Sequence, residues 1–320
     1  MSLTSRRGVL RGLAAGSIAV AAIGAAPTGA AAEPLSSDVD VAHAARDLVT
    51  AVTTTFRDKS AHDVNRTMAH FSQTQLTYTD GTLGLQFRDW AQLGALFAQL
   101  MPTWPESARS YPTRIIGQAT SGIVLFTDTP ELFGGEIRSI SPIDLSDGRI
   151  IRQVDYWDSR HFGTAAAAGL RVPAAQYPSD FGEQQIGERS HPTIRRVSTA
   201  LAGALSAGDV TAVTALLGPD AVFEDLALHT QLVGRQAIAS FLARALPLLP
   251  YGRAAVVRHV VGGVLGGGYE WTSQRGPVSV GVVALELDRQ ARVTRVTATW
   301  DGAALDVPAL TDLLATTVEQ

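Results

Sequence analysis

The stretch Leu76-Thr77-Tyr78-Thr79-Asp80 recurs later in the chain as Ala221-Val222-Phe223-Glu224-Asp225. Each copy has the β-branched and aromatic composition of a short strand, and each ends in an aspartate. Both aspartates stand 37 residues before a glycine that follows two aliphatic residues, Gly117 in one case and Gly262 in the other. The repeated motif at an unchanged spacing predicts an internal duplication.

A second pair of motifs closes the two copies. Tyr156-Trp157-Asp158 ends the first and Thr299-Trp300-Asp301 ends the second, with the tryptophans 77 and 75 residues after the matching aspartates. A chain of 320 residues is long enough for two domains of ordinary size. We therefore expect tandem domains at 33–170 and 191–320, joined by a linker at 171–190 that is rich in Pro, Gly and Gln.

Hydrophobic periodicity predicts the same elements in each copy. Helices are expected near 40–58, 62–72 and 89–101, and again near 191–207, 209–217 and 234–248. After the short strand, three further strands are expected near 112–127, 134–146 and 149–158, and again near 255–273, 277–288 and 291–301. Helices followed by strands are typical of an α+β fold in which the helices cover one face of a mostly antiparallel sheet.

The first 32 residues differ in composition from the rest of the chain. Arg6, Arg7 and Arg11 precede an uncharged apolar run that is too short to span a bilayer, and Ala30-Ala31-Ala32 fits a signal-peptidase site. The paired arginines resemble the twin-arginine consensus. We expect residues 1–32 to be a twin-arginine signal peptide, so that the protein is exported across the cytoplasmic membrane by the twin-arginine translocase and has no membrane span after cleavage.

Composition excludes several classes of protein. Hydrophobic residues make up 46% of the chain and charged residues 18%, as in globular proteins. Loss of the three leader arginines lowers the formal charge from −4 to −7, so nucleic acid is not an expected partner. There is no cysteine, and neither the histidines nor the glycines have the spacing of a metal or cofactor site. Lys59, the only lysine, is expected in a polar turn that does not favour amine catalysis.

The order of elements, the Phe223-Glu224-Asp225 turn and the closing segment 156–163 resemble the SnoaL-like polyketide cyclases of the nuclear transport factor 2-like superfamily. The resemblance covers nearly all of 40–312, once per copy. It implies two cone-shaped domains, each a curved sheet wrapped by three helices around an apolar pocket. It implies no single activity, because this superfamily includes isomerases, epoxide hydrolases, ring cyclases and proteins without catalysis. Neither copy has the tyrosine that the isomerases carry in their first long helix.

Pockets of this kind use a carboxylate whose pKa is raised by apolar walls. Tyr78 and Asp80 share one face of their strand, and Asp80 reaches the turn on which the isomerases of this superfamily carry their base. Asp225 has the same place in the second copy. Tyr78, Asp80 and Asp225 are therefore candidate catalytic residues, and an Asx turn that closes the following loop is the alternative role for both aspartates.

The final strands of the two copies differ at one position. Asp155 is two residues before Trp157 and so lies on the same face of its strand, whereas the second copy has Ala298 on the same face as Trp300. If this face is concave, Asp155 is a carboxylate in an apolar pocket and a candidate catalytic residue. The alternative is a partly solvated place at the pocket mouth. We expect the first copy to hold the more perturbed carboxylate.

His259, which corresponds to Arg114, is a further candidate donor or base, with a structural, hydrogen-bonded histidine as the alternative. Glu270 points away from its neighbours Tyr269 and Trp271 and is expected on the sheet surface. The residues expected to line the pockets are Trp157, Trp300, Trp271, Tyr269 and Arg114.

Three functions fit these features. The first is a cofactor-free cyclase, isomerase or epoxide-opening hydrolase that acts on an apolar small molecule such as a polyketide. The second is a non-catalytic binding protein for a hydrophobic small molecule, and the third is an interaction module that uses the convex face of the sheet. A deep pocket with polar groups favours the first, a wholly apolar pocket the second and a filled core the third. Substrate and oligomeric state stay open.

Overall fold

Two separate sheets of matching topology confirm the duplication. In the computed structural model, which describes residues 38–318, the first domain has a seven-stranded sheet and the second a six-stranded sheet. The order β4-β5-β6-β7-β2-β3 in the first matches β10-β11-β12-β13-β8-β9 in the second. The predicted α+β fold in two tandem copies is therefore confirmed, whereas the predicted signal peptide lies outside the described residues.

The first domain carries three helices before its long strands. Its elements are β1 (Asp40–Ala44), α1 (Arg46–Ser60), α2 (Val64–Ala69), β2 (Thr77–Asp80), β3 (Leu85–Phe87), α3 (Trp90–Leu100), β4 (Ser110–Gln118), β5 (Ser121–Asp128), α4 (Pro130–Phe133), β6 (Ile137–Ser146), β7 (Arg149–Trp157) and α5 (Thr164–Leu170). The segment predicted as an irregular linker contains the short turns η4 (Ala174–Gln176) and α6 (Glu183–Ile186).

The second domain repeats this plan. Its elements are α7 (Pro192–Ala207), α8 (Val210–Ala215), β8 (Leu217–Asp225), β9 (Thr230–Val233), α9 (Arg235–Ala245), β10 (Ala255–Gly262), β11 (Gly266–Ser273), β12 (Val280–Leu287), β13 (Val293–Trp300) and α10 (Val307–Ala315). Equivalent aspartates cap equivalent helices: Asp63 accepts from the backbone N–H of Arg66 at 2.9 Å, and Asp209 accepts from that of Ala212 at 2.9 Å. None of the helices within residues 38–318 is long and apolar enough to cross a membrane.

The predicted elements were wrong in three places. Residues 40–44 form a strand parallel to β4 instead of the start of a helix. The single strand expected at 112–127 is a hairpin of β4 and β5, and that at 255–273 is a hairpin of β10 and β11. Gly117 explains the first hairpin, because its φ is +138° and a Cβ there would lie 2.5 Å from the backbone of Gly122.

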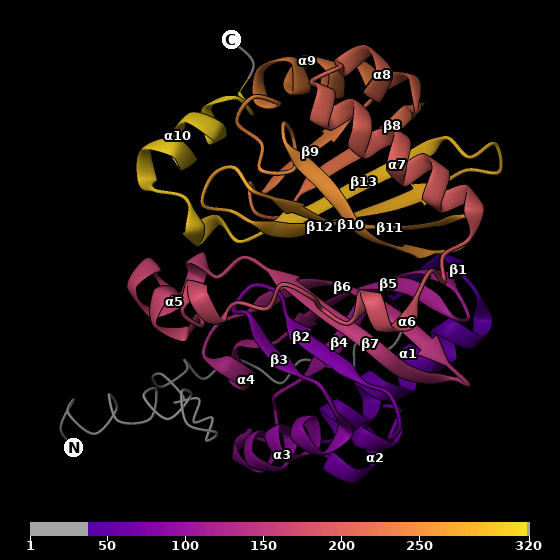
Figure 1. Cartoon of the computed structure of the whole chain (residues 1–320), viewed down its shortest axis with the longest axis vertical. Coiled ribbons are helices and arrows are strands. Elements are labelled where there is room, and N and C mark those ends of the chain that lie inside the picture. The colour runs from indigo at the N-terminus through magenta and orange to yellow at the C-terminus, as the bar shows by residue number, and fades with distance from the viewer. Residues whose placement is uncertain (1–37, 319–320) are drawn as a thin grey trace.

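The two sheets face each other and the helices lie outside them. Figure 1 shows α1, α2 and α3 on the outer face of one sheet and α7, α8 and α9 on the outer face of the other. Each domain has a hydrophobic core between its sheet and its helices, and a third cluster, which includes Ile116, Val154, Val261 and Val282, lies between the sheets. Strands β4 and β5 pack on β10 and β11, and β7 packs on β13. The faces of the two sheets that lie opposite the helices therefore pack largely on each other, which disfavours the third hypothesis.

Candidate functional site

A hydrogen-bonded tyrosine–aspartate pair lies on the helix side of the first sheet, with Asp155 buried and Tyr78 partly buried. Parallel pairing of β2 with β7 sets Tyr78 beside Gln153 and Asp80 beside Asp155. The Tyr78 hydroxyl donates a hydrogen bond to Oδ2 of Asp155, and Oδ1 accepts from the Ser141 hydroxyl and, at 2.9 Å, from Nε2 of Gln153. Asp155 is only 7% exposed, so its alternative place as a solvated residue at a pocket mouth was wrong.

Burial dominates the titration of this pair. It raises the pKa of Asp155, although the hydrogen bonds from Ser141, Tyr78 and Gln153 oppose that rise. Burial and the nearby carboxylate of Asp155 also raise the pKa of Tyr78 well above its ordinary value. The raised pKa of Asp155 makes its carboxylate a stronger base, and the raised pKa of Tyr78 keeps the phenol protonated, so the phenol can pass its proton to the carboxylate.

Tyr78 borders a small closed cavity between the sheet and the helices. The cavity measures about 30 Å³ and is lined by Val52, Thr55, Phe56, Lys59, Thr67, Phe71, Tyr78, Phe97, Val124, Ile143, Ile150 and Gln153. It has room for little more than a water molecule. Asp155 contacts the lining residues Tyr78 and Gln153 and does not line the cavity itself. Among residues 38–318, no cluster of three or more histidine, aspartate or glutamate side chains is placed to hold a metal ion.

Lys59 belongs to this cavity, and its predicted place in a polar turn was wrong. Helix α1 continues to Ser60, and the Lys59 side chain, 15% exposed, lies over the ring of Phe126 with Nζ 5.3 Å from the ring centroid. Its ammonium is 3.1 Å from Oδ1 of Asp128. The signal was present in the sequence, because Val52, Phe56 and Lys59 recur at helical spacing on one face.

Asp80 adjoins the pair at the end of β2. Its Oδ1 accepts from the backbone N–H groups of Thr82 and Leu83 at 3.0 and 2.8 Å, which is the Asx turn named as its alternative role. Its Oδ2 accepts from the Trp157 indole at 3.1 Å. Burial, reinforced by the charge of Asp155, raises the pKa of Asp80 to about 7 in spite of these donors. Its catalytic role stays a prediction.

Asp225 repeats this arrangement in the second domain. It accepts from the backbone N–H of Leu228 at 3.0 Å, from the Trp300 indole at 3.2 Å and from the Tyr251 hydroxyl at 2.7 Å. Burial raises its pKa to about 6. The matched indole contacts of Asp80 and Asp225 bear out the predicted correspondence of the two aspartates and of Trp157 with Trp300.

The polar groups around the first cavity have apolar counterparts in the second domain. Strand register and the helix-capping aspartates align Lys59, Tyr78, Ser141, Gln153 and Asp155 with Leu205, Phe223, Val283, Val296 and Ala298, respectively. All five replacements are buried in the core of the second domain. Tyr269, Trp271 and Trp300, which we expected to line a pocket, pack in this same core at 1% exposure each. Trp157 packs with Leu83 and Ile137 at the end of the first sheet and is absent from the cavity wall.

His259 and Arg114 lie between the domains, so their predicted places in the pockets were wrong. Nε2 of His259 is 3.0 Å from Oδ2 of Asp144 in the other domain, which is the structural alternative. Nε of Arg114 is 3.2 Å from Oε1 of Glu286, also across the seam. Consecutive side chains of a strand point to opposite faces of the sheet. Because Val260 and Ile115 point into the domain cores, their neighbours His259 and Arg114 point to the opposite faces, between the domains.

Glu270 was expected on the sheet surface and is instead fully buried between the sheets. Nη2 of Arg152 is 2.6 Å from its Oε2, and the Tyr156 hydroxyl donates to its Oε1 at 2.7 Å. Arg152 is likewise 0% exposed. A buried carboxylate needs such paired and hydrogen-bonded neighbours, so this cluster fixes how the two sheets meet.

Topology and site together define a duplicated α+β protein in which each domain has a tyrosine–aspartate hydrogen bond, Tyr78 to Asp155 in the first and Tyr251 to Asp225 in the second, and in which Tyr78 borders a cavity. Residues 197–305 match the SnoaL-like domain family, so the second domain is a SnoaL-like domain, and the first shares its strand order. No curated protein matches the chain.

Several solved structures are similar to part of the chain. A steroid delta-isomerase from Pseudomonas aeruginosa is 15% identical, with 41% of this chain and 93% of that one covered at a TM-score of 0.32. A SnoaL-like protein of unknown function from Burkholderia thailandensis is 14% identical, with 36% and 99% covered at a TM-score of 0.31. A de novo designed protein with a curved β-sheet is 16% identical, with 40% and 98% covered at a TM-score of 0.33.

Proposed function

We propose that the first domain is a cofactor-free acid–base enzyme for a small, largely apolar molecule, and that the second domain is its non-catalytic support. The observation that carries this proposal is the set of five polar positions around Tyr78 and Asp155 that are all apolar in the second domain. A duplicated fold needs none of these groups for its stability, since the second copy packs without them. Burial also raises the pKa of Asp225 in the second domain, so what distinguishes the first domain is that its tyrosine–aspartate pair adjoins a cavity that Lys59 also lines.

Tyr78 is the group that meets the substrate, because its ring borders the cavity while Asp155 lies behind it. A proton that leaves a substrate carbon passes to the Tyr78 oxygen as the Tyr78 proton passes to Asp155, and the reverse transfer returns it to another carbon. The Lys59 ammonium at the same cavity supplies positive charge for an enolate oxygen. Ser141 and Gln153 position the Asp155 carboxyl group.

The closed cavity limits access. Since about 30 Å³ holds little more than a water molecule, a substrate enters only when α1 and α2 move away from the sheet. The side chain of Lys59, in the last turn of α1, is 15% exposed and brings this part of the cavity lining into contact with solvent. This end of α1 is therefore the proposed entrance.

Proton transfer can be tested without knowledge of the natural substrate. Small cyclic ketones are incubated with the protein in D₂O, and exchange of their α-protons is followed by proton NMR. We expect the protein to accelerate exchange above buffer, and Tyr78→Phe and Asp155→Asn to lose about 10²–10⁴-fold of that acceleration. The matched control is Asp225→Asn, which alters the equivalent buried network and leaves exchange unchanged.

The second candidate is a binding protein without catalysis. It is favoured by the three donors on Asp155, which leave that carboxyl group little capacity to accept another proton donor. In this case ketones shift the NMR signals of cavity residues but their α-protons do not exchange faster than in buffer. That result would refute the enzyme and support the binder.

A further inference from the structure

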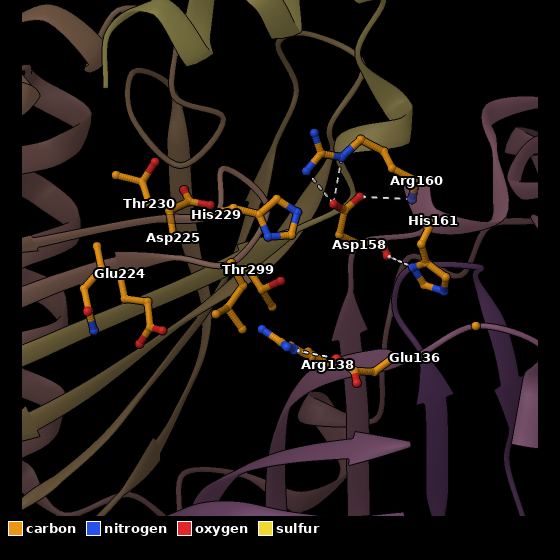
Figure 2. A pocket seen from close by; sticks show the side chains of 13 residues that line it. Glu136, Arg138, Asp158, Arg160, His161, Glu224, Asp225, His229, Thr230 and Thr299 are labelled. Atoms are coloured by element: carbon orange, nitrogen blue, oxygen red, sulfur yellow. Dashed lines mark hydrogen bonds and ion pairs between the residues drawn. The ribbon is translucent and has the colours of Figure 1, made fainter. Parts of the chain in front are cut away.

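A second, larger space lies on one side of the seam between the domains. It is a groove of about 750 Å³, a volume typical of small-molecule sites at domain interfaces. Figure 2 shows side chains from both domains turned toward it, with Glu136, Arg138 and Asp158 from the first and Glu224 and His229 from the second. Neither domain alone forms this groove, and it shares no lining residue with the cavity at Tyr78.

Comparison with the opposite side of the seam shows what is particular to this groove. The near two-fold arrangement places an equivalent groove of about 660 Å³ there, and linker residues such as Arg171 and Tyr177 form part of its wall. Its floor carries Tyr156, whose counterpart in the 750 Å³ groove is the smaller Thr299. Strand register likewise aligns Val278 and Val280 of that wall with Glu136 and Arg138. At these three positions the 750 Å³ groove carries a threonine and two charged residues where the opposite groove has a tyrosine and two valines.

Most charges in this groove have partners of opposite charge, and Asp225, which has none, accepts hydrogen bonds from Tyr251 and Trp300. Nε of Arg138 donates to Oε1 of Glu136 at 2.8 Å, and Nε of Arg160 donates to Oδ2 of Asp158 at 2.7 Å. Glu224 faces Arg295 at 3.5 Å. Burial lowers the pKa of His161, which keeps its ring neutral at pH 7. Among these groups, a charged ligand thus finds no charge of opposite sign that lacks both an ion-pair partner and hydrogen-bond donors.

Uncharged polar groups of the groove are available to form hydrogen bonds with a ligand. Thr299 is fully buried and lines the groove, and its hydroxyl has no hydrogen-bond partner among the described residues. An unpartnered buried hydroxyl is costly to a folded protein, and a ligand that bonds to it removes that cost. Thr230, His229 and Gln231 stand on the same wall, and Leu226 is the single large apolar side chain of the described lining.

We propose that this groove binds a neutral, polyhydroxylated molecule of monosaccharide or disaccharide size. Hydroxyl groups of such a ligand donate and accept hydrogen bonds at once, which matches Thr299, His229 and Gln231. The paired charges disfavour phosphates and other ions, and the scarcity of apolar side chains disfavours lipids and other hydrophobic molecules. The site is independent of the chemistry proposed for the first domain.

The test uses the full chain with glucose and maltose at millimolar concentration, observed by saturation-transfer NMR. At least one of the two sugars is expected to bind, and Thr299→Val to weaken binding about tenfold, the equivalent of one hydrogen bond. Thr299→Val is nearly isosteric and removes only the unpartnered hydroxyl. The matched control is Thr272→Val in the opposite groove, which leaves binding unchanged.

Gln231→Ala on the exposed rim provides a second variant that does not touch the core, and it is also expected to weaken binding. Failure of both sugars to bind would overturn the proposal, as would equal affinity of the wild type and Thr299→Val. Stronger binding of glucose 6-phosphate than of glucose would show that the groove selects anions, and it would overturn the claim of a neutral ligand.

Discussion

The hydrogen-bonded pair of Tyr78 and Asp155 can be converted to the residues of the second domain, Phe and Ala, one at a time and together. Tyr78→Phe removes one of three donors to a buried carboxyl group and is expected to cost about 1.5–3 kcal/mol of unfolding free energy. Asp155→Ala leaves the Tyr78 hydroxyl, the Ser141 hydroxyl and the Gln153 amide without their acceptor. At about 1–3 kcal/mol for each such group, offset by the loss of a desolvated acid, we expect about 3 kcal/mol.

The double variant is expected to lose less unfolding free energy than the two single variants lose in total, because it leaves no tyrosine hydroxyl without an acceptor. We expect a coupling energy of about 1–3 kcal/mol, measured by urea unfolding of the four proteins. Tyr251→Phe, which removes a 2.7 Å hydrogen bond to Asp225, is the control for a pair with a structural role only. Its stability should fall by a similar amount while ketone exchange is unaffected. Additive effects of Tyr78→Phe and Asp155→Ala, to within about 0.5 kcal/mol, would refute the direct contact.

Three further outcomes are expected. Glu270→Gln removes the nearest charge partner of the buried Arg152 guanidinium and leaves the carboxylates of Asp144 and Glu183 at 3.6 and 3.8 Å, so it should lower the unfolding free energy by about 3 kcal/mol in urea titrations; a loss below about 1 kcal/mol would contradict the buried pair. Because the folded state raises the pKa of Asp80 to about 7, it holds a proton that the unfolded state has released, so this contribution to stability is full below about pH 4 and lost by about pH 7. In Asp80→Asn, the unfolding free energy should no longer fall between about pH 4 and pH 7 for this reason. If the wild type and Asp80→Asn showed the same dependence of unfolding free energy on pH, the raised pKa of Asp80 would be refuted. We propose export through Arg6 and Arg7, so replacing both with Lys should abolish appearance of the protein outside the cytoplasm on immunoblots, whereas undiminished export would exclude the twin-arginine route.

Much of the fold could be predicted from the sequence because the two copies could be compared with each other. Equal spacing from Asp80 to Gly117 and from Asp225 to Gly262 marked equivalent strands, and the structure places both aspartates beside an indole N–H. Both long apolar runs were predicted as single strands. Their hairpin turns depend on Gly117 and Gly262 meeting glycines of the next strand, and such a close approach leaves no periodic signal.

The candidate site was predicted in part. Alternation along β2 and β7 correctly put Tyr78 and Asp155 on one face, since side-chain direction in a strand follows from position alone. Alternation cannot say what covers the opposite face. His259, Arg114 and Glu270 were therefore misplaced, because the surface on which they lie is buried by the other domain and not by a ligand or by solvent.

The seam between the sheets also determines which halves can associate. Glu270, the partner of Arg152, corresponds to Leu125 in the first domain, since strand register pairs Arg114 with Leu125 and His259 with Glu270. Two first domains brought together in the same way would set each Arg152 against a leucine and would leave Asp144, 3.6 Å away in the same domain, as its nearest carboxylate. The contact between Arg152 and Glu270 therefore favours the pairing of a first domain with a second domain over the pairing of two first domains, so each half of the chain presents a surface fitted to the other.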